Sequence, residues 1–273
     1  MEWQICAWFA LTGVLAGFLS GLLSIGGAFI MIPAFLAIFQ SYFHFDSKFL
    51  MQLTLGTTMA CMVVNATCTT LAHHGKKSVC WPVLARHWPL LCIGTFIGVA
   101  LTDFFNADLV KACFGFYCIY SGYRMVTRKN AEPVARPTGA HRATVLLFGT
   151  LCGFTGTGGA NLFVPYLMRS MGLDLKRAMG TAAAIQIPIS IVGATSFLAL
   201  GLASATAPAA MPYTGAAGFV FVPAWLLVSA AAPYFNKRGV ALAHRLPTAR
   251  LKTIFGIFTL LVGLKMLHAT QWV

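Results

Sequence analysis

The sequence predicts an all-α polytopic membrane protein made of two inverted repeats, each a broken or re-entrant helical hairpin followed by three transmembrane helices. Composition, an internal repeat and the distribution of basic residues support this prediction. Of the 273 residues, 58% are hydrophobic and only 9% are charged, which lies outside the range of soluble globular domains. Several apolar runs approach or exceed the roughly 20 residues that span a bilayer. These runs are Phe49–Ala72, Trp88–Leu101, Leu109–Val126, Ala178–Leu200, Phe219–Phe235 and Leu251–Leu267.

The chain contains an internal repeat. Residues 21–33 read GLLSIGGAFIMIP and residues 153–165 read GFTGTGGANLFVP, so two glycines, an alanine and a proline recur at identical spacing. A second pair of matching segments joins KACFGFYCIYSGYRMV at 111–126 to KTIFGIFTLLVGLKML at 252–267. The repeat predicts a first membrane unit over 1–130, a cytoplasmic linker over 131–141 and a second membrane unit over 142–273.

The basic residues predict how the chain is threaded through the membrane. Most of the 19 Lys and Arg fall in four connections, at residues 76–86, 124–142, 169–177 and 237–252. The positive-inside rule places all four in the cytoplasm. Eight plain crossings violate that rule. It is satisfied if Ile5–Phe39 and Ala143–Met168, which contain the Gly-Gly pairs, each enter and leave on one side. The two halves are then inverted and both termini are periplasmic. The alternative is a parallel repeat that breaks the charge rule.

The formal charge of +13 does not indicate nucleic-acid binding. The basic residues are dispersed in short connections between apolar spans, as topology signals are. The six carboxylates also lie in connections or at span ends. Because intramembrane carboxylates are the usual proton relays and cation sites, a proton pump or a metal-ion transporter is disfavoured. No catalytic residue, metal site or cofactor is predicted, and the chain is not expected to be an enzyme.

Each Gly-Gly pair interrupts an apolar run, and such a break inside a membrane is tolerated only against protein or a water-filled cavity. A helix that restarts after the break offers free N–H groups and a partial positive charge, which suit an anion. The alternative is close helix packing by small residues. The candidate substrate-binding residues are the two breaks and neutral donors on the spans that follow them. They are Gly26, Gly27, Ala28, Thr57, Thr155, Thr157, Gly158, Gly159, Asn161, Thr181 and Gln186.

The eight cysteines form no C-x-x-C pair and are predicted to be apolar packing residues. Cys152 stands just before the second break and is the one candidate for thiol chemistry.

The two G-x-x-x-x-G-G-x-x-x-x-x-P segments, each followed by a Gly-Thr span, resemble the TauE/SafE sulfite-exporter family, as do the closing segments FGFYCIYSGYRMV and FGIFTLLVGLKML. The resemblance covers nearly the whole chain. It implies a bacterial inner-membrane permease for sulfite, sulfonates or related small anions. In one respect the chain departs from twofold symmetry: the first break reads SIGGAF and the second reads GTGGAN. This difference assigns more of the substrate contact to the second half.

The predicted function is therefore secondary transport of a small sulfur-containing anion. Export is favoured, because an inside-negative potential drives an anion outward by about 2.3 kcal/mol per charge per 100 mV. An anion channel and an importer coupled to a cation remain as alternatives. Two alternatives from other classes are an intramembrane enzyme acting on thiols or lipids and a purely structural membrane subunit. The expected partners are the anion and the lipid bilayer, no nucleic acid is expected, and a homodimer is compatible with this architecture.

Overall fold

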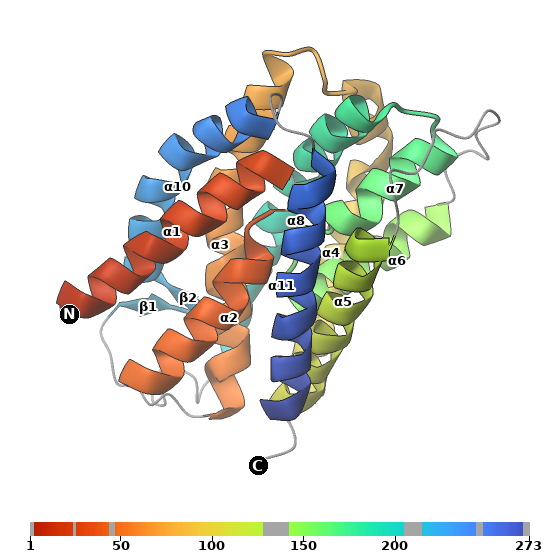
Figure 1. Cartoon of the computed structure of the whole chain (residues 1–273). Helices are drawn as coiled ribbons and strands as arrows, with labels where there is room; N and C mark the ends of the chain where they lie inside the picture. The colour runs from red at the N-terminus through yellow and green to blue at the C-terminus, as the bar shows by residue number, and fades with distance from the viewer. Residues whose placement is uncertain are drawn as a thin grey trace.

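The computed structural model describes residues 3–23, 26–43, 47–127, 142–204, 215–243 and 248–269, and almost all of them are helical (Figure 1). The first half contains α1 (Trp3–Leu23), α2 (Ala28–Ile38), a π-helical turn η1 (Phe39–Phe43), α3 (Ser47–His74), α4 (Trp81–Phe104) and α5 (Ala107–Thr127). The second half contains α6 (Arg142–Thr155), α7 (Ala160–Ser170), α8 (Leu175–Ala203), α10 (Val222–Ala243) and α11 (Thr248–Ala269). Two short paired strands, β1 (Ala216–Ala217) and β2 (Val220–Phe221), precede α10.

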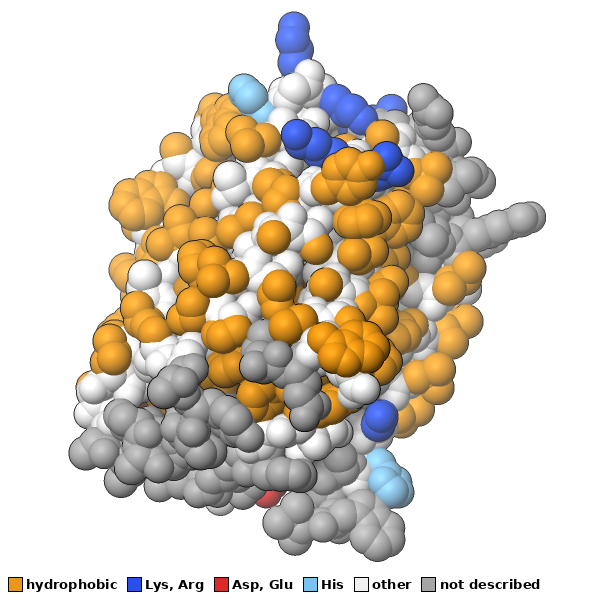
Figure 2. Space-filling model, turned by 90° about the vertical axis from the view of Figure 1, so that its left-hand side faces the viewer, with side chains coloured by type: hydrophobic (Ala, Val, Ile, Leu, Met, Phe, Trp, Pro, Cys, Tyr) orange, Lys and Arg blue, Asp and Glu red, His pale blue; other side chains and the backbone are white. Residues whose placement is uncertain are grey.

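The surface is that of a membrane protein. Large apolar side chains on the sides of the helices, such as Phe96, Phe116 and Leu261, are more than half exposed. Figure 2 shows an apolar band, with most of the Lys and Arg side chains visible on that face gathered at one end. Among the described residues, four helices are long and apolar enough to cross a bilayer, namely those over Trp3–Leu22, Phe49–His74, Trp81–Phe104 and Leu175–Ala203. The predicted all-α, multi-pass membrane class is confirmed.

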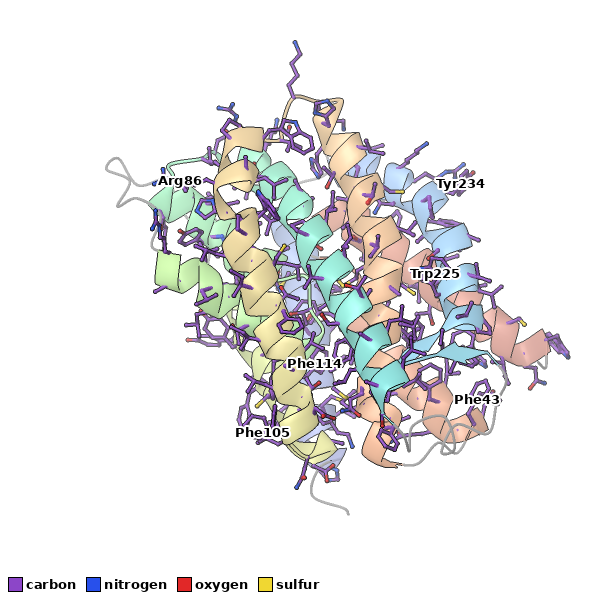
Figure 3. All side chains as sticks on the ribbon, turned by 180° about the vertical axis from the view of Figure 1, so that it is seen from behind. Phe43, Arg86, Phe105, Phe114, Trp225 and Tyr234 are labelled. Carbon is purple, nitrogen blue, oxygen red and sulfur yellow. The ribbon has the colours of Figure 1, made fainter. Side chains whose placement is uncertain are left out.

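The basic end of the molecule is formed by several connections. Arg86 lies near this end and Phe105 near the opposite one (Figure 3), so α4 runs from the basic end to the other. The turn after α3 and the start of α8 meet there. Burial, and then the nearby charge of Lys176, lower the pKa of Lys76. Because α3 ends where α8 begins, these two helices run in opposite directions.

The two halves pack through four pairs of helices, and each pair contains one helix from each half. α1 lies along α10 and α4 lies along α6, while α3 packs on α8 and α5 on α11. Glycines permit the close approach. A Cβ at Gly149 would lie 2.9 Å from the carbonyl oxygen of Leu91, and one at Gly122 would lie 2.6 Å from that of Gly256. Gly115 meets Gly263 further along the same pair, so α5 and α11 are antiparallel.

Two matching hydrogen bonds join the halves. The hydroxyl of Thr57 on α3 accepts a bond from the backbone N–H of Phe221 at 2.9 Å. The hydroxyl of Thr181 on α8 accepts one from the backbone N–H of Cys80 at 3.0 Å. In each case, a helix of one half holds the backbone just before a long helix of the other half.

The glycine before each of these threonines allows that contact. A Cβ at Gly180 would lie 2.5 Å from the carbonyl oxygen of Ser78, and one at Gly56 would overlap the carbonyl oxygen of Phe219. The repeated Gly-Thr pair is therefore a close-approach site followed by a hydrogen-bond acceptor.

Two predicted boundaries need correction. The run Trp88–Leu101 is part of the longer α4, because Pro82 sits in the first turn of that helix, where its missing N–H is no loss. Arg86 therefore lies on a helix and not in a connection. In the predicted run Phe219–Phe235, the helix α10 begins at Val222, because the preceding residues form a turn and β2. The two predicted hairpins, Ile5–Phe39 and Ala143–Met168, have first helices of different length, since α1 has 21 residues and α6 has 14.

Candidate functional site

The two interrupted helices restart at the predicted positions. α2 begins at Ala28 after the N-cap Gly27, and α7 begins at Ala160 after the N-cap Gly159. Within the described residues, no side chain caps either N-terminus, whereas the Asp174 side chain caps α8. Both restarts are buried. A buried helix N-terminus without a side-chain cap presents amide hydrogens and the positive end of the helix dipole to whatever lies in front of it.

Both breaks meet one side chain of α8. Gly26 has a φ of +74°, and a Cβ there would overlap Oε1 of Gln186. A Cβ at Gly158 would lie 2.6 Å from the same oxygen. Met62 of α3 flanks both glycines, with its methyl group 3.3 Å from a Cβ built at Gly26. The amide nitrogen of Gln186 donates to the carbonyl oxygen of Ala182 at 3.4 Å. The structure thus brings together residues 26, 158 and 186, which were predicted from the sequence as separate candidates.

The second break carries a buried pair of hydroxyls. Oγ1 of Thr155 and Oγ1 of Thr157 are 2.9 Å apart, and Thr155 also donates to the carbonyl oxygen of Leu151 at 2.7 Å. The N–H of Thr157 donates to the carbonyl oxygen of Cys152 at 3.0 Å. Gly159 has a φ of +67°, and a Cβ there would overlap Sγ of Cys152. Packing against this glycine accounts for the position of that cysteine beside the break.

Helix α5 touches both restarted helices. The amide of Asn161 on α7 donates to the hydroxyl of Ser121 on α5. One turn earlier on α5, the ring of Tyr117 stacks on Phe29 of α2, with centroids 5.6 Å apart, and its side chain lies beside Thr157. Phe29 and Asn161 hold equivalent places in the two copies of the repeat.

Met62 and Tyr117 were not among the residues predicted from the sequence. A comparison of the two copies of the repeat could have found them, because polar side chains near the breaks occur at positions where the two copies differ. Tyr117 aligns with Phe258 in the closing segments, and Gln186 aligns with Met62 when the two Gly-Thr pairs are superposed. The polar groups of the site are therefore not twofold symmetric, although the backbone elements are repeated.

Other nominated residues have different surroundings. The hydroxyls of Thr57 and Thr181 are engaged with backbone N–H groups of the opposite half, as described above. Their role as substrate ligands stays a prediction. Ala28 is fully buried in the first turn of α2. All eight cysteines are free thiols. Within the described part of the chain, no group of three His, Cys, Asp or Glu could hold a metal ion.

The fold and the site define a class. A multi-pass helical membrane protein that contains two interrupted helices, whose breaks meet inside the protein, has the architecture typical of secondary transporters.

Comparison with known proteins identifies the family. The family described as sulfite exporter TauE/SafE matches residues 9–266, and the chain belongs to this family. The chain is 26% identical over 264 residues to a probable membrane transporter protein of Haemophilus influenzae, covering 94% of this chain and 96% of that one. It is 23% identical over 261 residues to a probable membrane transporter protein of Methanocaldococcus jannaschii, covering 94% and 93%. The predicted family and the class of transmembrane transporter are confirmed, and these relatives are named as transporters rather than enzymes.

Proposed function

We propose that this chain is a secondary transporter that carries a small sulfur-containing anion, such as sulfite or an organosulfonate, and holds it at the two Gly-Gly breaks. The observation that carries the proposal is the convergence of the N-termini of α2 and α7 beside Gln186. Amide hydrogens and helix dipoles hold an anion without a full counter-charge. Such a site binds the anion and also releases it. The family description supports the chemical class of the substrate.

The same proposal includes an inverted repeat. In a parallel repeat, corresponding helices run in the same direction. Here α5 and α11, which contain the matching closing segments, are antiparallel, and so are α3 and α8. α1 and α6 are equivalent helices of the repeat, and so are α4 and α10. The contact of α1 with α10 is therefore matched by the contact of α6 with α4. These contacts support hairpins that enter from opposite faces, with the basic end in the cytoplasm and both termini in the periplasm of a bacterial inner membrane.

Labelling of single cysteines in intact cells tests the inverted arrangement. With the eight native cysteines replaced by Ala, a cysteine placed before Trp3 or after Ala269 should react with an impermeant maleimide added outside. A cysteine in the predicted linker over 131–141, which lies outside the described residues, should not react. Ends found on different sides of the membrane would exclude this topology.

Export is the proposed direction. The three carboxylates of the described residues, Asp103, Asp108 and Asp174, lie at or beside helix ends and not at the breaks. The membrane potential alone can drive an anion out, at about 2.3 kcal/mol per charge per 100 mV. Flux of radiolabelled sulfite through proteoliposomes under an imposed potential tests this directly. Flux independent of the potential contradicts uncompensated anion movement. Linear, unsaturable flux without exchange favours a channel, and a strict need for a co-transported cation favours coupled import.

Asn161→Ala is expected to weaken substrate binding while the protein still folds. The amide is the polar group that the second restarted helix adds to the site, and loss of one hydrogen bond of about 1 kcal/mol raises KM about fivefold. Ser121→Ala is the matched control, because it removes the hydrogen-bond partner of Asn161 on α5 but keeps the amide. An unchanged KM in Asn161→Ala over a full titration of substrate means that the second break does not contact the anion as proposed.

A further inference from the structure

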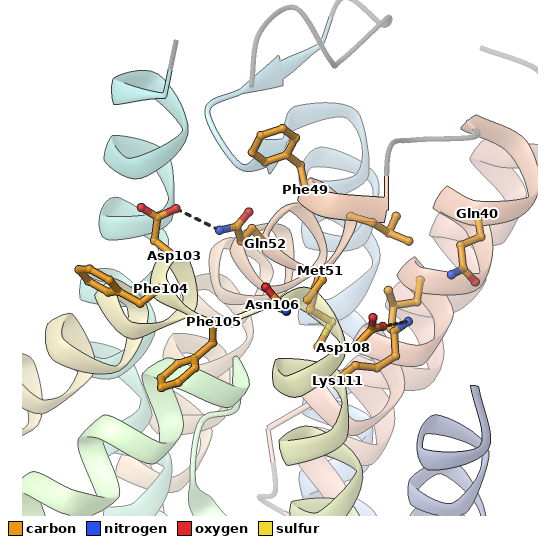
Figure 4. Close-up of a pocket in the computed structure, with 13 residues that line it drawn as sticks. Gln40, Phe49, Met51, Gln52, Asp103, Phe104, Phe105, Asn106, Asp108 and Lys111 are labelled. Carbon is orange, nitrogen blue, oxygen red and sulfur yellow. Dashed lines mark hydrogen bonds and ion pairs between the residues drawn. The ribbon is translucent and has the colours of Figure 1, made fainter. Parts of the chain in front are cut away.

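A cavity of about 340 Å³ opens at the end of the molecule opposite the basic end (Figure 4). It lies between η1, the start of α3, and the turn that joins α4 to α5. Its polar lining comes from neutral amides, two carboxylates and one lysine: Gln40, Gln52, Asn106, Asp103, Asp108 and Lys111. The cavity is large enough for a small hydrated anion, and it contains none of the residues that the proposed function assigns to the substrate.

Lys111 is the cation of this cavity. Its side chain is only 13% exposed, and its ammonium lies 3.6 Å from a carboxylate oxygen of Asp108, which is 53% exposed. A partly buried charge is screened less by salt than a surface charge, so Lys111 interacts with a nearby anion more strongly than an exposed lysine does. Asp108 is half exposed and can turn into water, whereas most of the Lys111 side chain is buried. An incoming anion can therefore replace Asp108 as the partner of Lys111. Asp103 has another partner, the amide of Gln52 at 3.5 Å.

A second, smaller gap continues the cavity into the protein. It has a volume of about 10 Å³ and shares Met51, Gln52, Phe105 and Ala107 with the larger cavity. Its inner wall includes Leu55 of α3, which is fully buried. On its other side, Leu55 lies against Gly156, where φ is +69° and a Cβ would overlap the leucine side chain. Leu55 therefore touches both this gap and the second helix break.

We propose that this cavity is the outer vestibule of the transport path, in which Lys111 docks a small sulfonate or sulfite anion and Leu55 closes the passage to the second break. Asp108 is the resting counter-ion of Lys111 and leaves it when the anion arrives. The inference rests on the proposed function, because only that function requires a path from this end to the breaks. It adds a docking site and a gate that lie outside the break residues.

Docking is tested by protection of a cysteine, which requires no transport. In the chain with its eight native cysteines replaced, Asn106→Cys at the mouth of the cavity is labelled with N-ethylmaleimide. Ethanesulfonate should slow the labelling, and tetramethylammonium should not. Lys111→Gln should raise the half-protecting concentration about fivefold, and Asp108→Asn should lower it by a similar factor. Asp103→Asn makes the same change of charge away from Lys111 and should leave it nearly unchanged.

The opposite results are decisive. Protection by tetramethylammonium instead of ethanesulfonate makes the cavity a cation site and overturns the inference. Equal effects of Asp103→Asn and Asp108→Asn show that overall charge, and not release of Lys111, controls the cavity, and they overturn the role of Lys111. If protection fails while the protein still transports sulfite, the vestibule is wrong and the proposed function stands. If protection holds but no sulfur anion is transported, the vestibule stands as an anion site and the proposed function fails.

The gate has its own test with a native thiol. In a chain that keeps only Cys152, beside the second break, Leu55→Ala should speed labelling by an anionic methanethiosulfonate about tenfold or more, because it shortens the closely packed side chain that is proposed to close the passage. Leu53→Ala is the matched control, since Leu53 is equally buried on α3 but lines neither cavity. Equal labelling of the two variants shows that general loosening, and not passage from the vestibule, exposes the thiol, and it overturns the role of Leu55.

Discussion

Gly158→Leu is expected to abolish transport. A Cβ at this position would already overlap the methyl group of Met62 and come within 2.6 Å of the amide oxygen of Gln186, so a leucine side chain fills the place where the two breaks meet. The proposed anion site needs that place free and the amide hydrogens of α7 accessible. Flux of radiolabelled sulfite into proteoliposomes, normalised to the amount of folded protein, measures the loss.

Two further variants distinguish a blocked anion site from a misfolded protein. Gly75→Leu is the control, because a Cβ at Gly75 would meet nothing closer than 3.8 Å, and this variant should transport normally. Gly158→Ala adds only the Cβ and should retain the thermal stability of the native protein more fully than Gly158→Leu while still impairing flux. Normal flux in well-folded Gly158→Leu would show that the anion passes elsewhere.

Gly56→Val and Gly180→Val are expected to destabilise the protein severely and to similar extents. At each site the new side chain meets a backbone carbonyl of the other half, Phe219 or Ser78, and backbone cannot move aside as a flexible side chain can. Overpacking of this kind typically costs about 1–3 kcal/mol, and clashes with backbone fall at or above the upper end. Thermal unfolding in detergent, followed by size-exclusion chromatography, measures the effect. Gly75→Val is the control and should leave the unfolding temperature unchanged.

The neighbouring threonine decides between a structural and a substrate role. Thr57→Val leaves the N–H of Phe221 without its acceptor and should cost about 1–3 kcal/mol of stability, whereas Thr57→Ser keeps the hydroxyl and should cost much less. KM of the folded fraction should stay the same in both variants. A raised KM with unchanged stability would instead support the substrate role that the sequence predicted for Thr57 and Thr181.

Local signals in the sequence located the helix breaks well. The restarts at Ala28 and Ala160 follow directly from glycines that permit the required backbone angles, since φ is +74° at Gly26 and +67° at Gly159. Hydropathy placed the start of α4 too late. The apolar run begins at Trp88, so Arg86 was counted in the preceding connection, whereas the helix begins at Trp81 with Pro82 in its first turn.

By itself the sequence determined that this chain is an apolar, repeated, helical membrane protein with two breaks and the motifs of its family, because these features depend on composition, spacing and backbone freedom within a few residues. Only the tertiary structure decided that Gly26 and Gly158 share one neighbour in Gln186, that Thr57 and Thr181 support the opposite half, and that Leu55 lines a small gap and also contacts Gly156. These facts depend on the packing of helices far apart in the chain, and periodicity within one helix does not encode which distant helix its buried face will meet.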